Sequence, residues 1–404
     1  MKNLYFIIFT LIGLPVFSQD YWQQRDSVNG PAKAVCGSFV ILERGFVVGG
    51  LDDFGFKRKM YSYNMFQDDW DDEESIGGVS GDGLQRGSAS SFAIGTKGYI
   101  CLGQSETVPY LDDMWEYDRA SGTWSQKANF AGGARKQAIS FVIDGIAYVG
   151  TGQGMTGLKK DFFKYDPTTN VWIQLNDFTG TARRQAVGFA MGAYGFVGTG
   201  DDGVMKKDFW MYTPSTDSWI QKTDFPGTAR AGATGWATFP TCLIATGEDI
   251  NFEYRKDVWE YNYYGNSWVQ RTDFPGAGRK NAISFVINGV AFLGTGYSGI
   301  FEDDFYAYYG IVGIGEHQQQ FQSIVFPNPV KDIATIEVIN ENVADLKLKV
   351  FSMSGQDLSD QLNVQNGIGK IQFDASQLSA GYYFYKLQDL ASGKISSGKV
   401  IVRK

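Results

Sequence analysis

Basic and acidic residues recur along the chain at a spacing that could gather them around one anion. The basic residues are Lys33, Arg86, Arg135, Arg183, Arg230 and Arg279. The acidic residues are Asp113, Asp161, Asp208, Asp257 and Asp304. A ring of guanidinium groups would suit a carboxylate or a sulfate, which makes Arg135, Arg183, Arg230 and Arg279 candidate ligand-binding residues. The alternative is an Arg–Asp pair repeated between strands as a structural clamp, and the regular repetition favours this alternative.

Chemistry that depends on imidazole or on paired thiols has little support in this chain. His317 is the single histidine, and the three cysteines are Cys36, Cys101 and Cys242. These residues do not supply a zinc site. No nucleophile with a matching base and no phosphate-binding glycine loop stands out, so we predict no catalytic residue and no metal site. Each cysteine lies in an apolar run and is expected to be a small buried side chain rather than half of a disulfide.

The acid-rich run from Asp68 to Glu74 is a candidate for calcium binding. It lacks the alternation of Asp or Asn around a central Gly that is typical of an EF-hand loop. A solvated acidic surface is therefore the favoured interpretation. We expect no cofactor, with calcium as the alternative.

A Tyr-x₆-Trp step recurs with a nearly fixed period and predicts the elements that position these residues. Its members are Tyr63/Trp70, Tyr117/Trp124, Tyr165/Trp172, Tyr212/Trp219 and Tyr261/Trp268. In the unit from Trp124 to Trp172 we predict four strands, named a to d, over residues 135–143, 146–150, 161–165 and 171–174. Asp144-Gly145 between strands a and b is typical of a two-residue hairpin turn.

Strand a of every unit has a small and a large face, because successive side chains of a strand point in opposite directions. One face carries Cys36, Ala89, Ala138, Ala186, Ala233 and Ala282, and two residues later Ser38, Ser91, Ser140, Gly188, Gly235 and Ser284. The other face carries Phe39, Phe92, Phe141, Phe189, Trp236 and Phe285. Small residues allow crowding around an axis and large ones fill the space between sheets, which is typical of a β-propeller.

Residues 20–309 resemble the kelch repeat family. The resemblance rests on the Tyr-x₆-Trp step and on glycine motifs before it, which are Gly49-Gly50, Gly150-Thr151-Gly152, Gly198-Thr199-Gly200, Ala245-Thr246-Gly247 and Gly294-Thr295-Gly296. The second unit departs from this pattern with Leu102-Gly103. The resemblance implies a propeller of six blades. Copper oxidation of sugars, as in galactose oxidase, needs two His ligands and is excluded by the single His of this chain.

The ring is expected to close through the N-terminal strand. The sixth unit ends after Tyr308 without a Trp, whereas Trp22 has no unit before it. A strand around Trp22 would therefore complete the last blade and remove its free edge. The predicted fold is all-β: a six-bladed propeller over residues 19–309, a linker over residues 310–323, and a small immunoglobulin-like β-sandwich over residues 324–404.

The segments that differ between units are the better candidates for a binding site. They lie in the b–c loops and the d–a links, on the side opposite the tight turns, over residues 51–56, 75–84, 104–111, 154–158, 201–205, 249–254 and 297–302. Their aromatic candidates are Tyr110, Phe252, Tyr254, Tyr297 and Phe301. Aromatic side chains beside carboxylates suit sugar rings or protein loops. The alternative is that these segments are solvated loops without a ligand.

Residues 1–18 read as a secretory signal peptide, with Lys2 before the apolar run from Leu4 to Leu14. An uncleaved anchor is the alternative. The net charge of −8 disfavours nucleic acid and anionic lipid as partners, because an acidic surface repels phosphate groups.

Residues 324–404 resemble the C-terminal sorting domain of the type IX secretion system of Bacteroidetes. The motifs are Phe326-Pro327-Asn328-Pro329, the stretch from Val350 to Gly355, and Leu378-Ser379-Ala380-Gly381-Tyr382-Tyr383. The sorting-motif residues are Pro327, Asn328, Pro329, Gly355, Gly381 and Tyr382. The resemblance implies export across the outer membrane, with the type IX machinery as partner and a final place on the cell surface or outside the cell. An ordinary immunoglobulin-like binding module is the alternative.

These observations predict a monomeric exported binding protein whose ligand is a glycan or an extracellular protein. A sugar-acting enzyme that resembles the kelch sialic-acid mutarotases is the first alternative, with Arg and acidic groups at the channel mouth. A structural component of the envelope without a ligand is the second.

Overall fold

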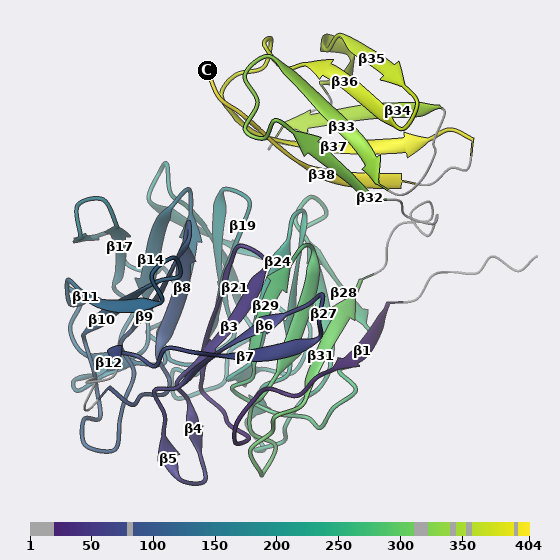
Figure 1. Cartoon of the computed structure of the whole chain (residues 1–404). Coiled ribbons are helices and arrows are strands. Elements are labelled where there is room, and N and C mark those ends of the chain that lie inside the picture. Colours follow the sequence, from purple (N-terminus) through teal and green to yellow (C-terminus); the bar gives the residue numbers. More distant parts are fainter. Residues whose placement is uncertain (1–19, 79–83, 311–321, 340–344, 353–357, 392–394) are drawn as a thin grey trace, which may run out of the picture. The chain divides into compact units, whose positions relative to one another are not determined.

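The structure is a computed structural model that describes residues 20–78, 84–310, 322–339, 345–352, 358–391 and 395–404 (Figure 1). The predicted signal peptide, most of the predicted linker and Gly355 lie outside the described residues. β-Strands are the main regular secondary structure of the described parts, which contain no α-helix, so the predicted all-β class is confirmed. No helix in these parts is long and apolar enough to cross a membrane.

The chain divides into two compact units, which are described separately. One comprises residues 20–310, and the described residues from 322 onward belong to the other.

The unit of residues 20–310 contains six four-stranded antiparallel sheets among its described residues. The first sheet holds β2 (Gly37–Ile41), β3 (Arg44–Val48), β6 (Met60–Asn64) and β7 (Asp69–Glu73), and the second holds β8 (Ser90–Ile94), β9 (Lys97–Cys101), β10 (Met114–Asp118) and β11 (Thr123–Lys127). The third holds β13 (Ile139–Ile143), β14 (Ile146–Gly150), β17 (Phe162–Asp166) and β18 (Val171–Gln174), and the fourth holds β19 (Val187–Met191), β20 (Tyr194–Gly198), β21 (Phe209–Thr213) and β22 (Ser218–Lys222). The fifth holds β24 (Thr234–Thr238), β25 (Thr241–Ala245), β27 (Val258–Asn262) and β28 (Ser267–Arg271), and the sixth holds β29 (Ile283–Ile287), β30 (Val290–Gly294), β31 (Phe305–Tyr309) and β1 (Tyr21–Arg25).

The strands predicted for the third unit agree closely with the observed ones. Strands b and d have the predicted bounds, and strand c begins one residue later, at Phe162. The predicted strand a is divided into β12 (Arg135–Lys136) and β13, because Gln137 between them has a positive φ of 58°. A residue in this left-handed conformation interrupts an extended strand.

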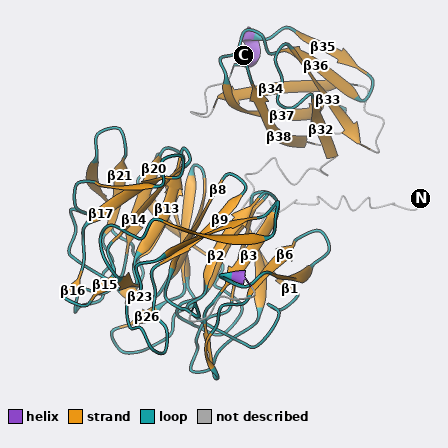
Figure 2. Cartoon of the chain, turned by 60° about the vertical axis from the view of Figure 1, so that its left-hand side comes forward, coloured by secondary structure: helices purple, strands orange, loops and turns teal. Residues whose placement is uncertain are grey.

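The six sheets are arranged in a ring (Figures 1 and 2). The first strands contact one another in the order β2, β8, β13, β19, β24, β29 and again β2. Aromatic side chains of these strands fill the space between neighbouring sheets. Phe39, Phe141 and Phe285 each lie directly on a glycine of the next sheet, where a side chain would collide with the ring; the glycines are Gly98, Gly195 and Gly45.

The Tyr-x₆-Trp step forms a cross-strand pair in the outer hairpin of each of the first five sheets. In the fourth sheet Tyr212 lies opposite Trp219, with the ring centroids 4.8 Å apart. The indoles of Trp70, Trp124, Trp172 and Trp268 donate hydrogen bonds to carbonyl oxygens of the preceding d–a link. The step therefore closes each hairpin and also ties neighbouring units together.

The sixth sheet is completed by the N-terminal strand, as the sequence predicts. Trp22 of β1 lies opposite Tyr308 of β31, and its indole donates to the carbonyl of Thr272 over 3.0 Å. Asp20 adds to this junction, since its carboxylate accepts hydrogen bonds from the Thr272 amide and the Tyr308 hydroxyl. The two ends of residues 20–310 are thus joined through one sheet.

Short strand pairs lie beyond the second strand of several units. They are β4 (Leu51–Asp52) with β5 (Gly55–Phe56), β12 with β15 (Gln153–Gly154) and β16 (Gly157–Leu158), and β23 (Arg230–Ala231) with β26 (Glu248–Asp249). In other units single β-bridges take the place of these strand pairs, for example between Arg184 and Asp201 and between Lys280 and Tyr297. β4 and β5 pair within one loop, and the bridge between Ala34 and Leu51 attaches that loop to the start of strand a. The pairs of β12 and β23 and the other bridges attach their b–c loops in the same way.

The C-terminal unit contains two sheets that enclose one hydrophobic core. One sheet has the order β32 (Gln322–Phe326), β33 (Ile333–Ile339), β36 (Lys370–Asp374) and β35 (Val364–Gly367). The other has the order β34 (Leu346–Ser352), β37 (Gly381–Asp389) and β38 (Ile395–Val402), and a short 3-10 turn covers Ser359–Gln361. Ile336 and Phe373 of the first sheet share the core with Leu348, Tyr385 and Val400 of the second.

Candidate functional site

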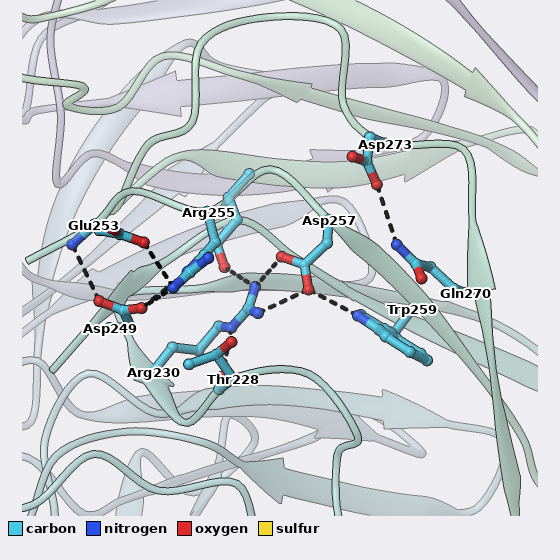
Figure 3. A network of polar contacts seen from close by, with 10 residues as sticks. Thr228, Arg230, Asp249, Glu253, Arg255, Asp257, Trp259, Gln270 and Asp273 are labelled. Atoms are coloured by element: carbon cyan, nitrogen blue, oxygen red, sulfur yellow. Dashed lines mark hydrogen bonds and ion pairs between the residues drawn. The ribbon is translucent and has the colours of Figure 1, made fainter. Parts of the chain in front are cut away.

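The repeated arginines are buried, and each binds one aspartate through two hydrogen bonds. In the fourth unit, Arg183 Nη1 and Nη2 donate to the two carboxylate oxygens of Asp208 over 2.6 and 2.7 Å. Nη1 also donates to the carbonyl of Thr199, and Nε donates to that of Thr181. Figure 3 shows the same arrangement around Arg230 and Asp257 in the fifth unit, where Trp259 also donates to Asp257. The other pairs are Arg86–Asp113, Arg135–Asp161 and Arg279–Asp304.

This geometry leaves the guanidinium groups engaged within the protein. The five arginines are 0% exposed, and four of them also lie against a phenylalanine ring, as Arg183 does on Phe178 at 5.0 Å. Arg135, Arg183, Arg230 and Arg279, which the sequence offers as ligand-binding candidates, therefore have the geometry of the alternative, a clamp between strand a and strand c.

The arginines of three clamps lower the pKa of Asp113, Asp208 and Asp257. Burial by itself would raise the pKa of Asp208, but the hydrogen bonds and the charge of Arg183 outweigh burial and hold this pKa below its ordinary value of 3.8. The same balance lowers the pKa of Asp113 beside Arg86 and of Asp257 beside Arg230. These carboxylates are charged at neutral pH and neutralise the buried guanidinium groups.

The first unit departs from this pattern. Its basic residue is Lys33, which is 3% exposed and donates to the carbonyl of Asn29. The ammonium lies 4.4 Å from the ring centre of Tyr61, in the arrangement of a cation–π contact. Desolvation lowers the pKa of Lys33, since no carboxylate forms a direct ion pair with it among the described residues.

The b–c loops carry an exposed apolar side chain in all six units. We call Phe54, Val108, Met155, Val204, Phe252 and Ile300 the loop tips; their exposed fractions are 84, 41, 84, 63, 77 and 68%. Because every unit repeats the same strand order, the six loops lie on one side of the ring. On the other side, the described a–b and c–d turns carry large exposed apolar residues only in the first and fifth units, at Leu42, Phe66, Phe239 and Tyr264.

Three of the predicted aromatic candidates lie together at the fifth and sixth units. The ring centroids of Tyr254 and Tyr297 are 6.1 Å apart, and those of Tyr297 and Phe301 are 5.3 Å apart. The Lys280 ammonium lies 5.6 Å from the Tyr254 ring and donates to Glu248 over 2.8 Å. These residues form an aromatic surface with an ion pair beside it, which we call the aromatic platform (Tyr254, Tyr297, Phe301, Lys280 and Glu248).

The other two candidates lie elsewhere on the same side. Tyr110 of the second unit faces the Lys136 ammonium at 5.3 Å, and Lys136 donates to Gln104. Phe252 is a loop tip and takes no part in the aromatic platform. The structure therefore brings together Tyr254, Tyr297 and Phe301 but not Tyr110 or Phe252.

The loop of the fifth unit is held in a fixed conformation by Asp249. This residue is 0% exposed, and its carboxylate accepts hydrogen bonds from the backbone amide of Asn251 and from that of Glu253. Figure 3 shows Asp249 beside Glu253 and Arg255. Arg255 forms ion pairs with both Asp249 and Glu253. The loop presents Phe252 to solvent at a position determined by these polar contacts.

A groove of about 660 Å³ lies on the loops of the first two units. Its lining includes Phe54, Phe56, Lys57, Arg58 and Glu106. Lys57 pairs with the buried Asp52, and Arg58 donates to the carbonyls of Ile76 and Gly78. The groove thus combines an exposed ring with side chains that are already bound within the protein.

The acid-rich run does not gather its carboxylates around one point. Asp68 accepts from the Tyr63 hydroxyl, Asp71 pairs with Arg44, Asp72 pairs with Lys59, and Glu73 accepts from Tyr117. No group of three or more potential metal ligands occurs among the residues that the structure describes.

The three cysteines are free, and burial governs their chemistry. Burial raises the pKa of the Cys36 and Cys101 thiols to about 12 and raises that of Cys242 well above its ordinary value. Thiols with such pKa values are protonated and unreactive at neutral pH. Their predicted role as small buried side chains agrees with this geometry.

One further set of equivalent residues is not among the candidates that the sequence offers. It comprises the residue two positions after each leading basic residue, namely Val35, Ser88, Gln137, Gln185, Gly232 and Asn281. All six have a positive φ, between 53° and 63°. Polar side chains at four of the six positions, just before an apolar strand, were the available signal.

The described sorting-motif residues lie before β33, near the start of the C-terminal unit, and at the beginning of β37. Asn328 accepts a hydrogen bond from the Ile401 amide and donates to the Lys399 carbonyl. Pro327 and Pro329 flank it. Gly381 begins β37, and the next residue, Tyr382, is exposed with the Lys399 ammonium 3.8 Å from its ring centre.

Residues 324–403 match the family model of the secretion system C-terminal sorting domain. The predicted sorting domain is confirmed. It implies export through the type IX secretion system, contact with the machinery of that system, and a place on the cell surface or outside the cell. No curated protein matches the chain.

Proposed function

We propose that residues 20–310 form a six-bladed kelch-type propeller, and that the chain is an exported binding protein which takes a glycan or an extracellular protein on its b–c loop side. The six sheets in ring order, the closing strand β1 and the cross-strand Tyr–Trp pairs support the propeller. The sorting domain supports the export. A signal peptide over residues 1–18, and an immunoglobulin-like fold for the sorting domain, belong to the same proposal.

The observation that carries the binding function is the set of loop tips. Single exposed apolar side chains are ordinary on a protein surface, so the support for a binding side comes from their recurrence in every loop of one side. Here all six b–c loops expose one at an equivalent place, while most of the described a–b turns on the other side do not. Beside the tips, the aromatic platform offers rings and paired charges, which suit sugar rings or polar protein loops.

The same geometry favours a binding protein over a sugar-acting enzyme. The enzyme alternative places Arg and acidic groups at the channel mouth to act on the sugar, but the five repeated arginines are each bound to an aspartate. Opening one of these pairs to bind a substrate would leave a buried charge without a partner, which is costly.

The proposal is tested by presenting the purified full chain to arrays of glycans and of extracellular proteins. The informative variant is Phe54→Ser/Phe252→Ser, which removes two loop tips. Phe66→Ser is the matched control, since Phe66 is 70% exposed on a turn of the opposite side. We expect the loop variant to bind every positive array member at least tenfold more weakly, and the control to bind like the unchanged chain.

Two results would contradict the proposal. Equal losses in the loop variant and the control would show that binding does not use the loop side. No saturable binding to either array, together with turnover of a sugar acid, would favour the enzyme.

A further inference from the structure

A closed ring of six backbone hydrogen bonds surrounds the axis of the six sheets. The ring runs from Val35 to Asn281, from Asn281 to Gly232, from Gly232 to Gln185, from Gln185 to Gln137, from Gln137 to Ser88 and from Ser88 back to Val35, each residue donating its amide to the carbonyl of the one named next. The distances are between 2.7 and 3.2 Å. We call these six residues the axial ring. Their positive φ values turn the amide and the carbonyl of each residue toward its neighbours in the ring.

The axial ring bounds a cavity of about 150 Å³. The lining consists of the ring residues and the small residue after each of them: Cys36, Ala89, Ala138, Ala186, Ala233 and Ala282. The small side chains leave the space open. None of the lining residues is charged, and the polar ones are Ser88, Gln137, Gln185 and Asn281.

Two polar side chains of the axial ring form a hydrogen bond with each other, and two have a buried oxygen without a hydrogen-bond partner in the protein. Gln185 donates to Asn281 over 3.3 Å, and Gly232 lies between these two residues in the ring. A side chain on Gly232 would come within 2.8 Å of the Asn281 oxygen. In contrast, Ser88 Oγ and Gln137 Oε1 are buried and have no hydrogen-bond partner in the protein. Ser88 is 8% exposed.

Unpaired buried polar atoms in a native protein call for an explanation, because they lose their bonds to water on folding. Alanine or leucine in place of Ser88 or Gln137 would avoid that loss. Val35, the equivalent residue of the first unit, shows that an apolar side chain fits at such a position of the axial ring. Ser88 and Gln137 lie in adjacent units and present a hydroxyl and a carboxamide oxygen to the same cavity.

We propose that the cavity within the axial ring binds a neutral, hydroxyl-rich ligand, namely one sugar residue of a glycan. A hydroxyl group can both donate to Gln137 Oε1 and exchange a hydrogen bond with Ser88 Oγ. The absence of charge in the lining disfavours anions and cations, since their desolvation would be uncompensated. The volume is about five times the share of one water molecule in the liquid, about 30 Å³, so it suits a group larger than a single water.

The position of the cavity connects it with the loop side. Each ring residue directly follows a residue that bridges to its own b–c loop, as Gln137 follows Lys136, which pairs with Gln153. The axial site rests on the proposed function for the choice of a glycan as ligand. The end of the glycan would enter the axial ring while the rest of it contacts the b–c loops.

The experiment uses the full chain and four free sugars as probes. These are the methyl glycosides of glucose, galactose and N-acetylglucosamine, with glucuronic acid as the charged counterpart. Saturation-transfer NMR titrations give the affinity of each sugar. We expect at least one neutral glycoside to bind, and glucuronic acid to bind at least tenfold more weakly.

The variants Ser88→Ala and Gln137→Leu should each weaken that binding at least tenfold. Gln126→Leu is the matched control, because Gln126 is exposed on the outer strand β11. The melting temperature without sugar is measured in parallel, and both cavity variants should melt at or above the temperature of the unchanged chain, since each removes an unpaired buried polar atom. A structural role for these side chains would instead lower the melting temperature.

The outcomes separate this inference from the proposed function. If no neutral glycoside binds, or if binding is equal in the cavity variants and in the control, the axial site is overturned even when the arrays show binding to the loops. If the glycosides bind in the ring and the loop-tip variant keeps all its array binding, the axial site stands and the loop-side function fails.

Discussion

The clamps and the b–c loops lie within a few residues of each other in the sequence, yet they follow opposite rules. Five units repeat the Arg–Asp pair with nearly the same distances, and the arginines are fully buried. The loops that follow strand b in these same units differ in sequence, and their tips are exposed. The clamp is repeated in five of the six units, whereas the loop sequence changes from unit to unit.

Burial explains this difference. A buried charge is stable only with a partner in good geometry, so a clamp tolerates little change once it is formed. An exposed loop tip contacts solvent, and changing it alters the energy of the fold very little. Variation is therefore tolerated on the loop side, and this is where a ligand specificity can differ without cost to the ring.

The largest predicted effect comes from breaking one clamp. Arg183→Ala leaves the Asp208 carboxylate without its partner and should lower the free energy of unfolding by about 3–5 kcal/mol. Urea unfolding followed by tryptophan fluorescence measures this, because all ten tryptophans lie between Trp22 and Trp268 and report on residues 20–310 alone.

Lys160→Ala is the control for the clamp. Lys160 and its partner Asp177 are 50 and 47% exposed and 3.9 Å apart, so the loss should stay below about 1 kcal/mol. Similar losses in the two variants would contradict the contrast between buried pairs and surface pairs.

A somewhat smaller loss of unfolding free energy is expected when the closing strand β1 is weakened. Trp22→Ala removes an indole that packs on Trp236, Phe274 and Tyr308 and donates to Thr272. The same unfolding experiment should show a loss of about 2–3 kcal/mol, since the Trp is half-buried. Tyr21→Ala, on the exposed side of the same strand, should cost less than about 1 kcal/mol. An unchanged midpoint for Trp22→Ala would overturn the closing role of β1.

The clamps also predict a dependence of stability on pH. The pKa values of Asp113, Asp208 and Asp257 are lower in the folded protein than their ordinary value of 3.8. Their contribution is thus complete above that ordinary value and is lost as the pH falls through the folded pKa values. Unfolding curves between pH 7 and pH 2.5 should show a stability plateau that declines below about pH 4.

The double variant Arg183→Met/Asp208→Leu serves as the control for pH, because it lacks one of the three titrating carboxylates. It should lose less stability than the unchanged chain over the acid range. A decline of the same size would assign the acid sensitivity to other groups.

The smallest effect on stability is expected at the loop tips. Phe54→Ser and Phe252→Ser should each change the free energy of unfolding by no more than about 0.5 kcal/mol, because both side chains are mostly in solvent already. A loss above about 1 kcal/mol in the same urea experiment would mean that the loop tips support the fold and do not differ from the clamps in this respect.

Much of the architecture could be predicted because its signals are local. The alternation along strand a, the Asp144-Gly145 turn and the Tyr-x₆-Trp step are each contained within about ten residues. Such short patterns depend on the local geometry of strands and turns, so they can be recognised in the sequence. The displaced Trp22 even indicated how the last sheet is completed. The division of strand a at Gln137 was missed, since a Gln gives no local sign of a positive φ.

The candidate site was predicted less completely. The segments that hold all six loop tips were identified by their variation between units, but of the tips only Phe252 was singled out. Tyr254, Tyr297 and Phe301 were named as separate candidates, and their grouping with Lys280 and Glu248 arises from the approach of two neighbouring loops. The arginines were identified as a repeated feature with two alternative roles, and burial decides in favour of the clamp geometry.

The sequence by itself determined the order of the strands, the number of repeated units and the sorting domain, because each of these is written in a periodic or contiguous pattern. Only the tertiary structure decided which side chains are buried, which partner each charge has, and that six residues about 50 positions apart form one hydrogen-bonded ring. The physical reason is that these properties depend on packing between distant segments, and no local pattern records whether a polar atom finds a partner after the chain has closed on itself.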